Sequence, residues 1–429
     1  MTTHREHLAD AEGVRDRIPE EGRQVHRGAT PRHLLVSTAY RQQPDGTWTA
    51  PETAGADLDL AYLTTTLVTE LDDTGQPISS STKPDLMVRR LESLDIHDGH
   101  RVLEIGTGTG YNAALLAHRL GDEHVHSLDV DPVLVDTART RFPAIGRHPH
   151  LAARDGVQGW PDHAPYDRII ATCSVPGIPW TWAEQAAPGA RLLTDLKVGS
   201  GAGNLVLLHR HPNRLEGRFT GRWAGFMPMR HHTTTTGIPA PSVRAEQQRE
   251  HSTTAPAEPW KTRRELWLLA SFTLPPDLRH GYTLDPATRT PNAATLTASD
   301  GPWCHVTLGD GPRQVREGGP TPLWTHVENV WRTWNDNGQP GWNASASPSP
   351  PTPTPSGSTT PTTRSQPCAA APTTTPSSDQ HRCPPVPNTV ASAPRTVRHV
   401  PALNMTLWLF NGRPRPSGAT SRTNSAGAG

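Results

Sequence analysis

The chain has 429 residues, of which 34% are hydrophobic, 19% are charged and 45 are prolines; this composition excludes one compact domain throughout and indicates folded and unfolded parts. The formal net charge is zero, with 41 basic and 41 acidic residues, so no global charge supports a nucleic-acid or membrane surface, and no apolar run approaches the roughly 20 residues that span a bilayer. The four cysteines form no CxxC pair and the N-terminus shows no secretory signal pattern, so we expect a cytoplasmic protein with no nucleic-acid partner, no membrane segment and no metal site.

Changes in composition divide the chain into five segments. Residues 1–30 are polar and aperiodic and should be disordered, whereas 31–230 should fold as an α/β domain. A stretch rich in Thr, Pro and Gln predicts a linker over 231–259, after which Trp, Leu and Val return and predict an accessory domain over 260–343. Residues 344–429 are rich in Pro, Thr and Ser and cannot bury enough apolar surface to offset their ordering entropy, so we expect a disordered tail.

Helix and strand signals alternate within the predicted α/β domain. Apolar residues at helical spacing predict helices, and short apolar runs predict buried parallel strands. In chain order the expected elements are a helix over 87–94, a strand over 100–106, a helix over 111–121, a strand over 124–131, a helix over 132–142 and strands over 166–174 and 190–196. This order predicts a doubly wound, mostly parallel sheet with ligands at the carboxyl ends of its strands.

A glycine-rich turn joins the first expected strand to the next helix. In VLEIGTGTGYN, residues 102–112, the glycines at 106, 108 and 110 let the backbone turn sharply and approach a ligand closely. The GxGxG pattern alone is weak evidence, because dinucleotide enzymes show a similar turn. Glu104 places an acid near the loop, where a pyrophosphate would be repelled but the cationic methionine part of S-adenosylmethionine would not.

Two further acids follow at the ends of later strands. Asp129 ends the next strand, at about the spacing from which ribose hydroxyls are bound, and Asp155-Gly156 follows the strand-like HLAAR, where a carboxylate could accept the adenine amino group. Each acid also has a simpler explanation: Glu104 as a solvated strand end, Asp129 as a cap before Pro132, and Asp155 as a turn residue. The three acids in this order favour S-adenosylmethionine as the cofactor.

Four stretches of this domain together resemble the protein-L-isoaspartate O-methyltransferases. They are VLEIGTGTGY, SLDVD, RDGVQGWPDHAPYDRIIATCSVP and EQAAPGARLL, of which the DG…GWP…APYDRII block is the most specific. The resemblance runs over 78–196 and implies a class I, Rossmann-like methyltransferase fold. It also implies that S-adenosylmethionine is bound by Glu104, Gly106, Thr107, Gly108, Gly110, Asp129, Val130, Asp155 and Gly156.

The acceptor side departs from that family. The family has a Ser-x-Pro segment ahead of the glycine loop, and here Thr82-Lys83-Pro84 stands at the corresponding place in ISSSTKPDLMV. Ser80, Ser81 and Thr82 are therefore the candidates for binding the substrate carboxylate. A capped helix start, with Pro84 in its first turn, is the alternative, and both can hold because a helix start also presents amide groups to an anion.

A narrower resemblance covers SSST-x-P, ATCSVP, AGFMPMR and the Trp-rich region 260–341. These stretches are similar to the methyltransferases that accompany ATP-grasp ligases in the maturation of ribosomally made, crosslinked peptides (graspetides). This resemblance implies an aspartyl or isoaspartyl peptide as substrate, an ester that closes to an aspartimide and an ATP-grasp ligase as partner. The Trp-rich face of the accessory domain either packs on the first domain or recognises the peptide. The alternatives are a general isoaspartyl repair enzyme, a nicotinamide-dependent oxidoreductase and a binding module without catalysis. The tail is either a disordered extension or a frameshifted reading.

Three other features suggest chemistry but have simpler interpretations. Cys173 follows a buried strand and is more consistent with a packed core thiol than with a nucleophile. The pair His231-His232 lacks further metal ligands at suitable spacing. Trp324, Trp331 and Trp334 have the spacing of one apolar helix face.

Overall fold

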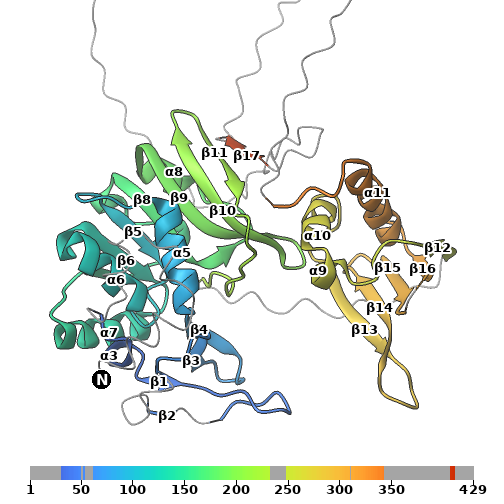
Figure 1. Cartoon of the computed structure of the whole chain (residues 1–429), viewed down its shortest axis with the longest axis horizontal. Coiled ribbons are helices and arrows are strands. Elements are labelled where there is room, and N and C mark those ends of the chain that lie inside the picture. The colour runs from blue at the N-terminus through green and yellow to red at the C-terminus, as the bar shows by residue number, and fades with distance from the viewer. Residues whose placement is uncertain are drawn as a thin grey trace, which may run out of the picture. The chain divides into compact units, whose positions relative to one another are not determined.

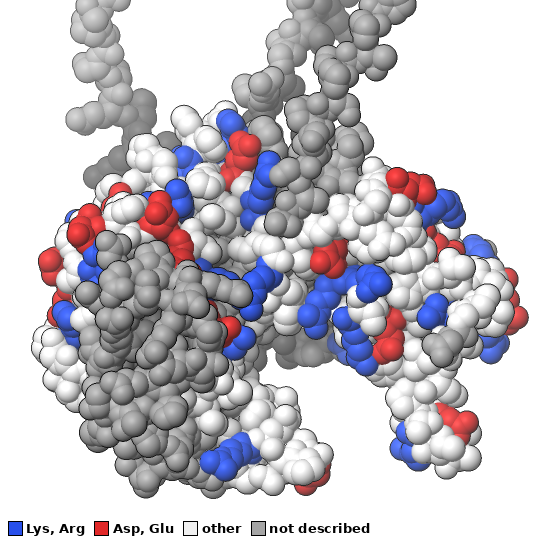
Figure 2. Space-filling view, in the orientation of Figure 1, with Lys and Arg blue, Asp and Glu red and all other residues white. Residues whose placement is uncertain are grey.

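The computed structural model describes residues 30–49, 52–53, 61–231, 248–309, 311–342 and 406–410 (Figure 1). All of them fall in one of the two compact units into which the chain divides. Among these residues, the helices are too short and too polar for any of them to cross a bilayer. On the face shown in Figure 2, acidic and basic side chains are interspersed, in keeping with the zero net charge.

The central element is an eight-stranded sheet of strand order β17-β11-β10-β9-β8-β5-β6-β7. Its parallel part confirms the predicted doubly wound sheet and consists of β5 (Val102–Ile105), β6 (Val125–Asp129), β7 (His150–Ala153), β8 (Tyr166–Val175) and β9 (Ala186–Val198). Three antiparallel strands extend it, namely β10 (Ala202–His211), β11 (Arg214–Phe219) and β17 (Thr406–Phe410). All residues of β5 and β6 are buried, as expected for central parallel strands that helices cover on both faces.

Helices and short 3-10 turns connect the parallel strands. They are α5 (Pro84–Leu94), α6 (Tyr111–Leu120), η3 (Asp122–His124), α7 (Pro132–Arg141), η4 (Phe142–Ile145), η5 (Gly156–Gln158), η6 (Pro161–His163) and α8 (Trp180–Gln185). The sequence explains how α7 begins, because Pro132 suits a first turn and the Asp131 carboxylate accepts the Val133 amide at 3.0 Å. The connections therefore bring the loops after β5, β6 and β7 to one edge of the sheet.

Short N-terminal elements precede the first parallel strand. They are α3 (Arg32–Leu35), β1 (Thr38–Ala39), β2 (Glu52–Thr53), β3 (Leu67–Leu71) and β4 (Pro77–Ser81), with β3 and β4 forming an antiparallel hairpin. The ISSS run lies in β4 and leads directly into α5, which begins at Pro84 rather than at the expected residue 87. The hydroxyl-rich segment is thus held between a hairpin and a helix.

A second, five-stranded antiparallel sheet forms the accessory region. In spatial order its strands are β12 (Arg249–Thr253), β16 (Arg313–Gly318), β15 (Trp303–Thr307), β14 (Pro291–Thr297) and β13 (Arg279–Leu284), and its helices are α9 (Pro259–Thr262), α10 (Arg264–Ser271) and α11 (Leu323–Asp336). The apolar helix face is confirmed, since Trp324 and Trp334 of α11 are buried. The buried Glu317 carboxylate accepts the Trp324 amide at 2.8 Å and so satisfies the start of α11.

Two predicted boundaries are wrong. The linker was expected to extend to residue 259, yet β12 already pairs with β16 and Ala255 and Ala257 are buried. Within the tail expected to be disordered over 344–429, β17 pairs with β11. β12 is an edge strand of polar residues, and its backbone hydrogen bonds to β16 stabilise it. β17 has the apolar sequence TLWLF and pairs along the open edge of β11. Residues 1–29 and the rest of the tail lie outside the described residues.

Three histidines gather where β6 and β7 meet η6. His126 is buried in β6, with its ring centroid 4.7 Å from that of His150 and 4.5 Å from that of His163. Burial first, and then the two neighbouring imidazoles, lower the pKa of His126 to about 3. The folded protein therefore holds His126 neutral at pH values where the unfolded chain would protonate it.

We expect His126 to make the protein less stable in acid. Because its folded pKa lies below the ordinary value of 6.5, its stabilising contribution is complete above pH 6.5 and is lost as the pH falls towards about 3. One proton of difference gives a slope of at most about 1.4 kcal/mol per pH unit. Urea denaturation of the wild type and of His126→Phe at pH 7.5 and pH 5.0 tests this. The wild type should lose more stability than the variant, and an equal loss in both contradicts the assignment.

Candidate functional site

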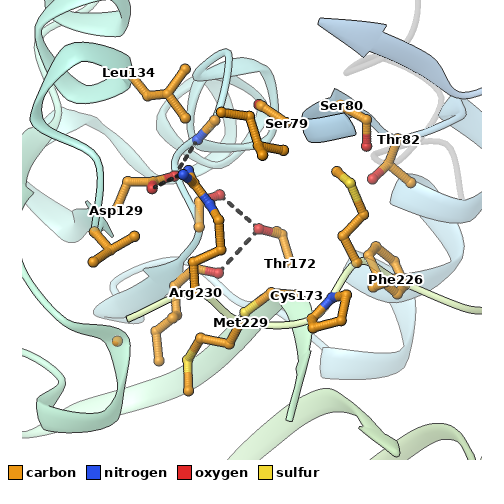
Figure 3. A pocket seen from close by; sticks show the side chains of 18 of the residues that line it. Ser79, Ser80, Thr82, Asp129, Leu134, Thr172, Cys173, Phe226, Met229 and Arg230 are labelled. Atoms are coloured by element: carbon orange, nitrogen blue, oxygen red, sulfur yellow. Dashed lines mark hydrogen bonds and ion pairs between the residues drawn. The ribbon is translucent and has the colours of Figure 1, made fainter. Parts of the chain in front are cut away.

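A pocket opens at the carboxyl ends of β5, β6 and β8 (Figure 3). The β4 segment forms one wall, and residues 225–230, here called the strap, form another. Seven of the predicted site residues line this pocket: Ser80, Thr82, Gly106, Gly108, Asp129, Val130 and Gly156. The structure therefore brings the glycine loop, the acid after β6 and the acceptor hydroxyls together, as the sequence predicts.

The glycine loop is held in a conformation that needs glycine. Gly106 has φ +99°, and a Cβ there would lie 2.3 Å from the Thr172 hydroxyl of β8. That hydroxyl donates to the carbonyl oxygens of Ile105 (3.0 Å) and Gly106 (2.6 Å), so it ties the start of the loop to the neighbouring strand. The loop can therefore expose its backbone to the pocket without a side chain in the way.

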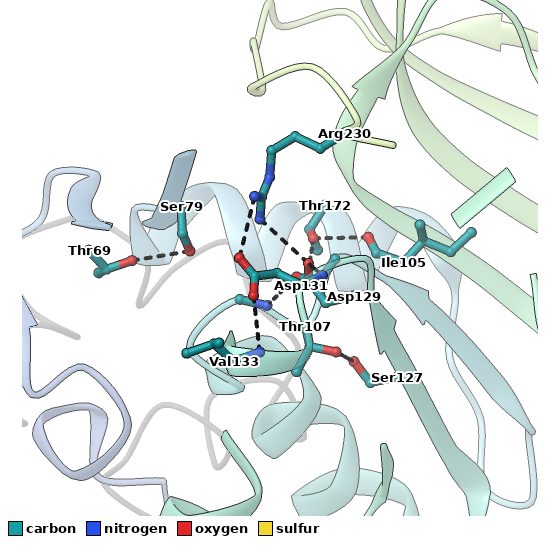
Figure 4. Close-up of polar contacts among 12 residues, drawn as sticks. Thr69, Ser79, Ile105, Thr107, Ser127, Asp129, Asp131, Val133, Thr172 and Arg230 are labelled. Carbon is teal, nitrogen blue, oxygen red and sulfur yellow. Dashed lines mark hydrogen bonds and ion pairs between the residues drawn. The ribbon is translucent and has the colours of Figure 1, made fainter. Parts of the chain in front are cut away.

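Glu104 does not line the pocket. It is fully buried, and its carboxylate accepts from Asn112 Nδ2 at 2.7 Å and from Ser127 Oγ at 2.6 Å. Thr107, also predicted to contact the cofactor, lies outside the lining and shares a hydrogen bond of 2.7 Å with Ser127 (Figure 4). Burial raises the pKa of Glu104 to about 7, although both hydrogen bonds lower it. Glu104 and Thr107 thus hold the glycine loop from the interior of the protein. The buried Glu104 carboxylate needs hydrogen-bond donors there, and Asn112 and Ser127 supply them.

Asp129 is the acid that faces the pocket. One carboxylate oxygen accepts the Gly108 amide at 3.0 Å and the other accepts the Asp131 amide at 3.1 Å. Burial raises its pKa, while these two amides and the charge of Arg230 lower it. Figure 4 shows Arg230 reaching towards both Asp129 and Asp131. The carboxylate is therefore fixed against the glycine loop with lone pairs left for a ligand.

The other predicted cofactor residues differ in their placement. Gly156 lines the pocket, whereas the Asp155 carboxylate accepts the Val157 amide at 3.0 Å and lies 3.1 Å from His231 Nδ1. Gly110 is also outside the lining: it begins α6 with φ +84°, and a Cβ there would press on the ring of Phe142 at 3.1 Å. Gly110 thus serves the packing of α6 on its neighbours.

The acceptor wall contains two of the three predicted hydroxyls. Ser80 and Thr82 line the pocket, but the buried Ser81 hydroxyl accepts from Arg32 Nη2 at 3.1 Å and does not line it. Ser79, the first serine of the same hydroxyl run, also lines the pocket and accepts from Thr69 Oγ1 at 3.2 Å. The structure therefore does not place Ser81 on the pocket, because its side chain is buried against Arg32, far away in the sequence.

Other pocket residues were also missed by sequence reasoning. Thr172, Cys173 and the strap line the pocket, and the strap is fixed to β8 by hydrogen bonds between the backbones of Ser174 and residues Met227 and Met229, both 2.8 Å. Burial raises the pKa of the Cys173 thiol to about 12, so this thiol stays protonated near neutral pH. The sequence AGFMPMR carried the only signal for the strap, and that signal gave no role.

Comparisons with known proteins match this chain to protein-L-isoaspartate O-methyltransferases. The family model described as protein-L-isoaspartate(D-aspartate) O-methyltransferase (PCMT) matches residues 60–219. A protein-L-isoaspartate O-methyltransferase of Methylorubrum populi is 35% identical over 155 residues, which cover 36% of this chain and 70% of that relative. One of Methanosarcina mazei is 36% identical over 134 residues, 31% of this chain and 53% of the relative, and one of Anaeromyxobacter dehalogenans is 40% identical over 137 residues, 31% and 61%.

A solved structure of a protein-L-isoaspartate O-methyltransferase is 21% identical, with a TM-score of 0.47, and the match covers 79% of this chain and 94% of that chain. The chain spans only about half the length of the Methanosarcina mazei relative and somewhat more of the other two. With 70% of the Methylorubrum populi relative matched at 35% identity, the chain belongs to the protein-L-isoaspartate O-methyltransferase family.

Proposed function

We propose that this chain is an S-adenosylmethionine-dependent O-methyltransferase that methylates an aspartyl or isoaspartyl carboxylate on a peptide or protein. One observation carries the proposal: a single pocket has the anchored acid Asp129 and the bare backbone of the glycine loop on one side, and the hydroxyls of Ser80 and Thr82 on the other. Such a pocket can hold a nucleoside and an anionic acceptor together. The family membership of the chain supports the same activity.

The pocket residues fit the cofactor. Each Asp129 oxygen is used by one backbone amide, which leaves lone pairs for the two ribose hydroxyls. Gly106 and Gly108 have positive φ values, +99° and +50°, and expose their backbone where a methionine portion would lie. Gly156, next to Asp155, lines the far end of the pocket, where the adenine ring would pack.

The chemistry requires positioning rather than proton transfer. When bound, the cofactor would supply a sulfonium methyl group as the electrophile for one acceptor carboxylate oxygen, and the electron pair of the broken carbon–sulfur bond would stay on sulfur. The acceptor is already ionised near neutral pH, so no general base is needed. Ser80 and Thr82, which line the pocket, would orient the carboxylate by donating hydrogen bonds. Alignment of this kind can lower a barrier by up to roughly 7–11 kcal/mol.

Replacing Thr82 by valine should lower kcat/KM about 10- to 100-fold and leave the affinity for S-adenosylhomocysteine unchanged. The reason is that valine keeps the shape of the side chain but removes a hydroxyl that donates to a charged acceptor, an interaction of about 1.5–3 kcal/mol. Methyl transfer to an isoaspartyl peptide and calorimetric binding of S-adenosylhomocysteine measure the two effects. Thr140→Val, at an exposed position of α7, is the matched control. An equal loss in both variants, or weaker cofactor binding by Thr82→Val alone, contradicts the acceptor role.

We further propose that the acceptor is a crosslinked ribosomal peptide, that an ATP-grasp ligase acts before this enzyme, and that the methyl ester closes to an aspartimide. The accessory sheet and its helices support this, since residues 249–342 form a second sheet with its own helices outside the 60–219 matched by the family. The alternative is general isoaspartyl repair. Both functions share the chemistry and differ in what the accessory region must recognise.

Transfer of a labelled methyl group from S-adenosylmethionine separates the two functions. One acceptor is an isoaspartyl test peptide, and the other is a crosslinked precursor peptide encoded beside this gene. Label on the crosslinked precursor alone supports peptide maturation, whereas efficient labelling of the simple isoaspartyl peptide supports repair. If neither acceptor is labelled although the cofactor binds, the proposed acceptor is wrong.

A further inference from the structure

Three consecutive strap and post-strap residues contact the three positions assigned to the adenosyl part of the cofactor. Met229 lies against Gly156, Arg230 faces Asp129, and His231 pairs with Asp155. Each of the three contacts involves a different residue of the proposed adenosine site. The three side chains together therefore cover the whole adenosine site rather than one part of it.

Arg230 makes the central contact. Its Nη2 lies 3.7 Å from Asp129 Oδ1, and its Nη1 lies 3.4 Å from Asp131 Oδ2. In Figure 3 its side chain extends from the strap over Asp129, and Arg230 is the one cationic residue in the described lining of this pocket. Both distances exceed the 2.7–2.9 Å of a strong charged hydrogen bond, and the Arg230 side chain is 34% exposed, so these ion pairs are weak.

The two neighbours of Arg230 cover the adenine side. A Cβ at Gly156 would lie 2.9 Å from Met229 Sδ, which shows that the methionine side chain rests directly on this glycine. His231 Nδ1 lies 3.1 Å from Asp155 Oδ2, the carboxylate assigned to the adenine amino group. The thioether is flexible, and the His231 side chain is 40% exposed, so a ligand can displace both.

The backbone that carries these side chains is firmly held. The Phe226 amide donates to Asp195 Oδ2 at 2.7 Å and the Phe226 carbonyl accepts from Lys197 Nζ at 2.5 Å. Backbone hydrogen bonds of 2.8 Å join Ser174 to Met227 and Met229. The strap therefore presents Met229 and Arg230 to the pocket from a fixed position, and His231 follows directly after it. A ligand thus has to displace side chains rather than the main chain.

We propose that the end of the strap, together with the following His231, competes with the cofactor. Arg230 and His231 pair with Asp129 and Asp155, the two acids assigned to the ribose and the adenine. This inference rests on the cofactor assignment of the proposed function. When the ribose hydroxyls donate to Asp129, they replace an ion pair of about 0–1 kcal/mol with hydrogen bonds to a charged group, which are worth more. Arg230 lowers cofactor affinity and thereby promotes release of the demethylated product, S-adenosylhomocysteine.

The affinity of Arg230→Met for S-adenosylhomocysteine, measured by isothermal titration calorimetry without any acceptor, tests the competition. We expect binding about 2- to 5-fold tighter than in the wild type, the equivalent of the weak ion pair that is removed. S-adenosylhomocysteine has no net charge at neutral pH, so added salt should mainly weaken the ion pairs of Arg230 within the protein. Added salt should therefore tighten binding to the wild type and leave binding to Arg230→Met unchanged.

Two further variants make the result specific. Arg230→Lys keeps the positive charge and should bind like the wild type, and Arg139→Met, at an exposed position of α7, is the matched control. Thermal denaturation shows that each variant is folded. Unchanged or weaker binding by Arg230→Met overturns the proposal and makes Arg230 a neutral or supporting residue. Absence of binding to the wild type overturns the cofactor assignment as well, so the two failures are distinguishable.

Discussion

Replacement of Asp129 by alanine should weaken S-adenosylhomocysteine binding by roughly 100-fold or more. Two hydroxyl donors to one carboxylate are each worth about 1.5–3 kcal/mol, so losing both removes on the order of 3 kcal/mol or more. The same carboxylate accepts the Gly108 amide at 3.0 Å, so alanine also releases the middle of the glycine loop. Isothermal titration calorimetry measures the affinity, and circular dichroism shows whether the fold is kept.

The sign of this effect separates Asp129 from its partner Arg230. Both substitutions break the same ion pair, yet Asp129→Ala should weaken binding and Arg230→Met should strengthen it. If the ion pair simply stabilised the pocket, both would weaken binding. Asp136→Ala removes an exposed acid of α7 and should have no effect on affinity. Asp129→Ala with near wild-type affinity would show that the ribose is bound elsewhere.

The parallel core could be predicted because its determinants are local. β5 and β6 are short and fully buried, and the helices that follow them begin or end at residues with clear preferences, such as Pro132 at the start of α7 and Gly121 after α6. Strands stabilised mainly by their partners could not be predicted. β12 is polar in sequence, and β17 lies in a Pro- and Thr-rich tail; both are strands because an open sheet edge is available to them.

The same division holds within the site. Asp129, Gly106 and Gly108 follow from the order of strand, glycine loop and strand, and the structure places all three on the pocket. Ser81 was predicted because it directly precedes Thr82 in the hydroxyl-rich segment, but its buried hydroxyl accepts from Arg32, a contact between distant parts of the chain.

Glu104 shows that a motif can identify the correct residue with an incomplete role. The acid lies near the glycine loop as expected, but it is fully buried and binds Asn112 and Ser127 instead of facing the pocket. The strap could not be predicted from the sequence for a different reason. It pairs with β8 at the bridge between Ser174 and Pro228, and pairing between distant segments leaves no periodic pattern in the sequence.

Gly106→Ala should abolish cofactor binding and lower the free energy of unfolding by about 2–4 kcal/mol. A non-glycine residue at φ +99° is strained by about 1–3 kcal/mol, and the new Cβ would lie 2.3 Å from the Thr172 hydroxyl. Thr172 can yield only by giving up its hydrogen bonds to the carbonyls of Ile105 and Gly106, which hold the loop against β8. Urea titration measures the stability, and S-adenosylhomocysteine titration measures the pocket.

The effect of backbone strain can be separated from that of the Cβ collision, because Gly146 has a positive φ but no atom near its Cβ position. Gly146 has φ +66° and nothing within 4 Å of its Cβ position, so Gly146→Ala should cost only about 1 kcal/mol and leave cofactor binding intact. In the double variant Gly106→Ala/Thr172→Ala the colliding hydroxyl is absent, and part of the lost stability should return. If Gly106→Ala matches Gly146→Ala in both measurements, the Thr172 contact does not shape the loop. The exposed backbone of the glycine loop would then no longer be evidence for cofactor binding, and the cofactor assignment would rest on Asp129 alone.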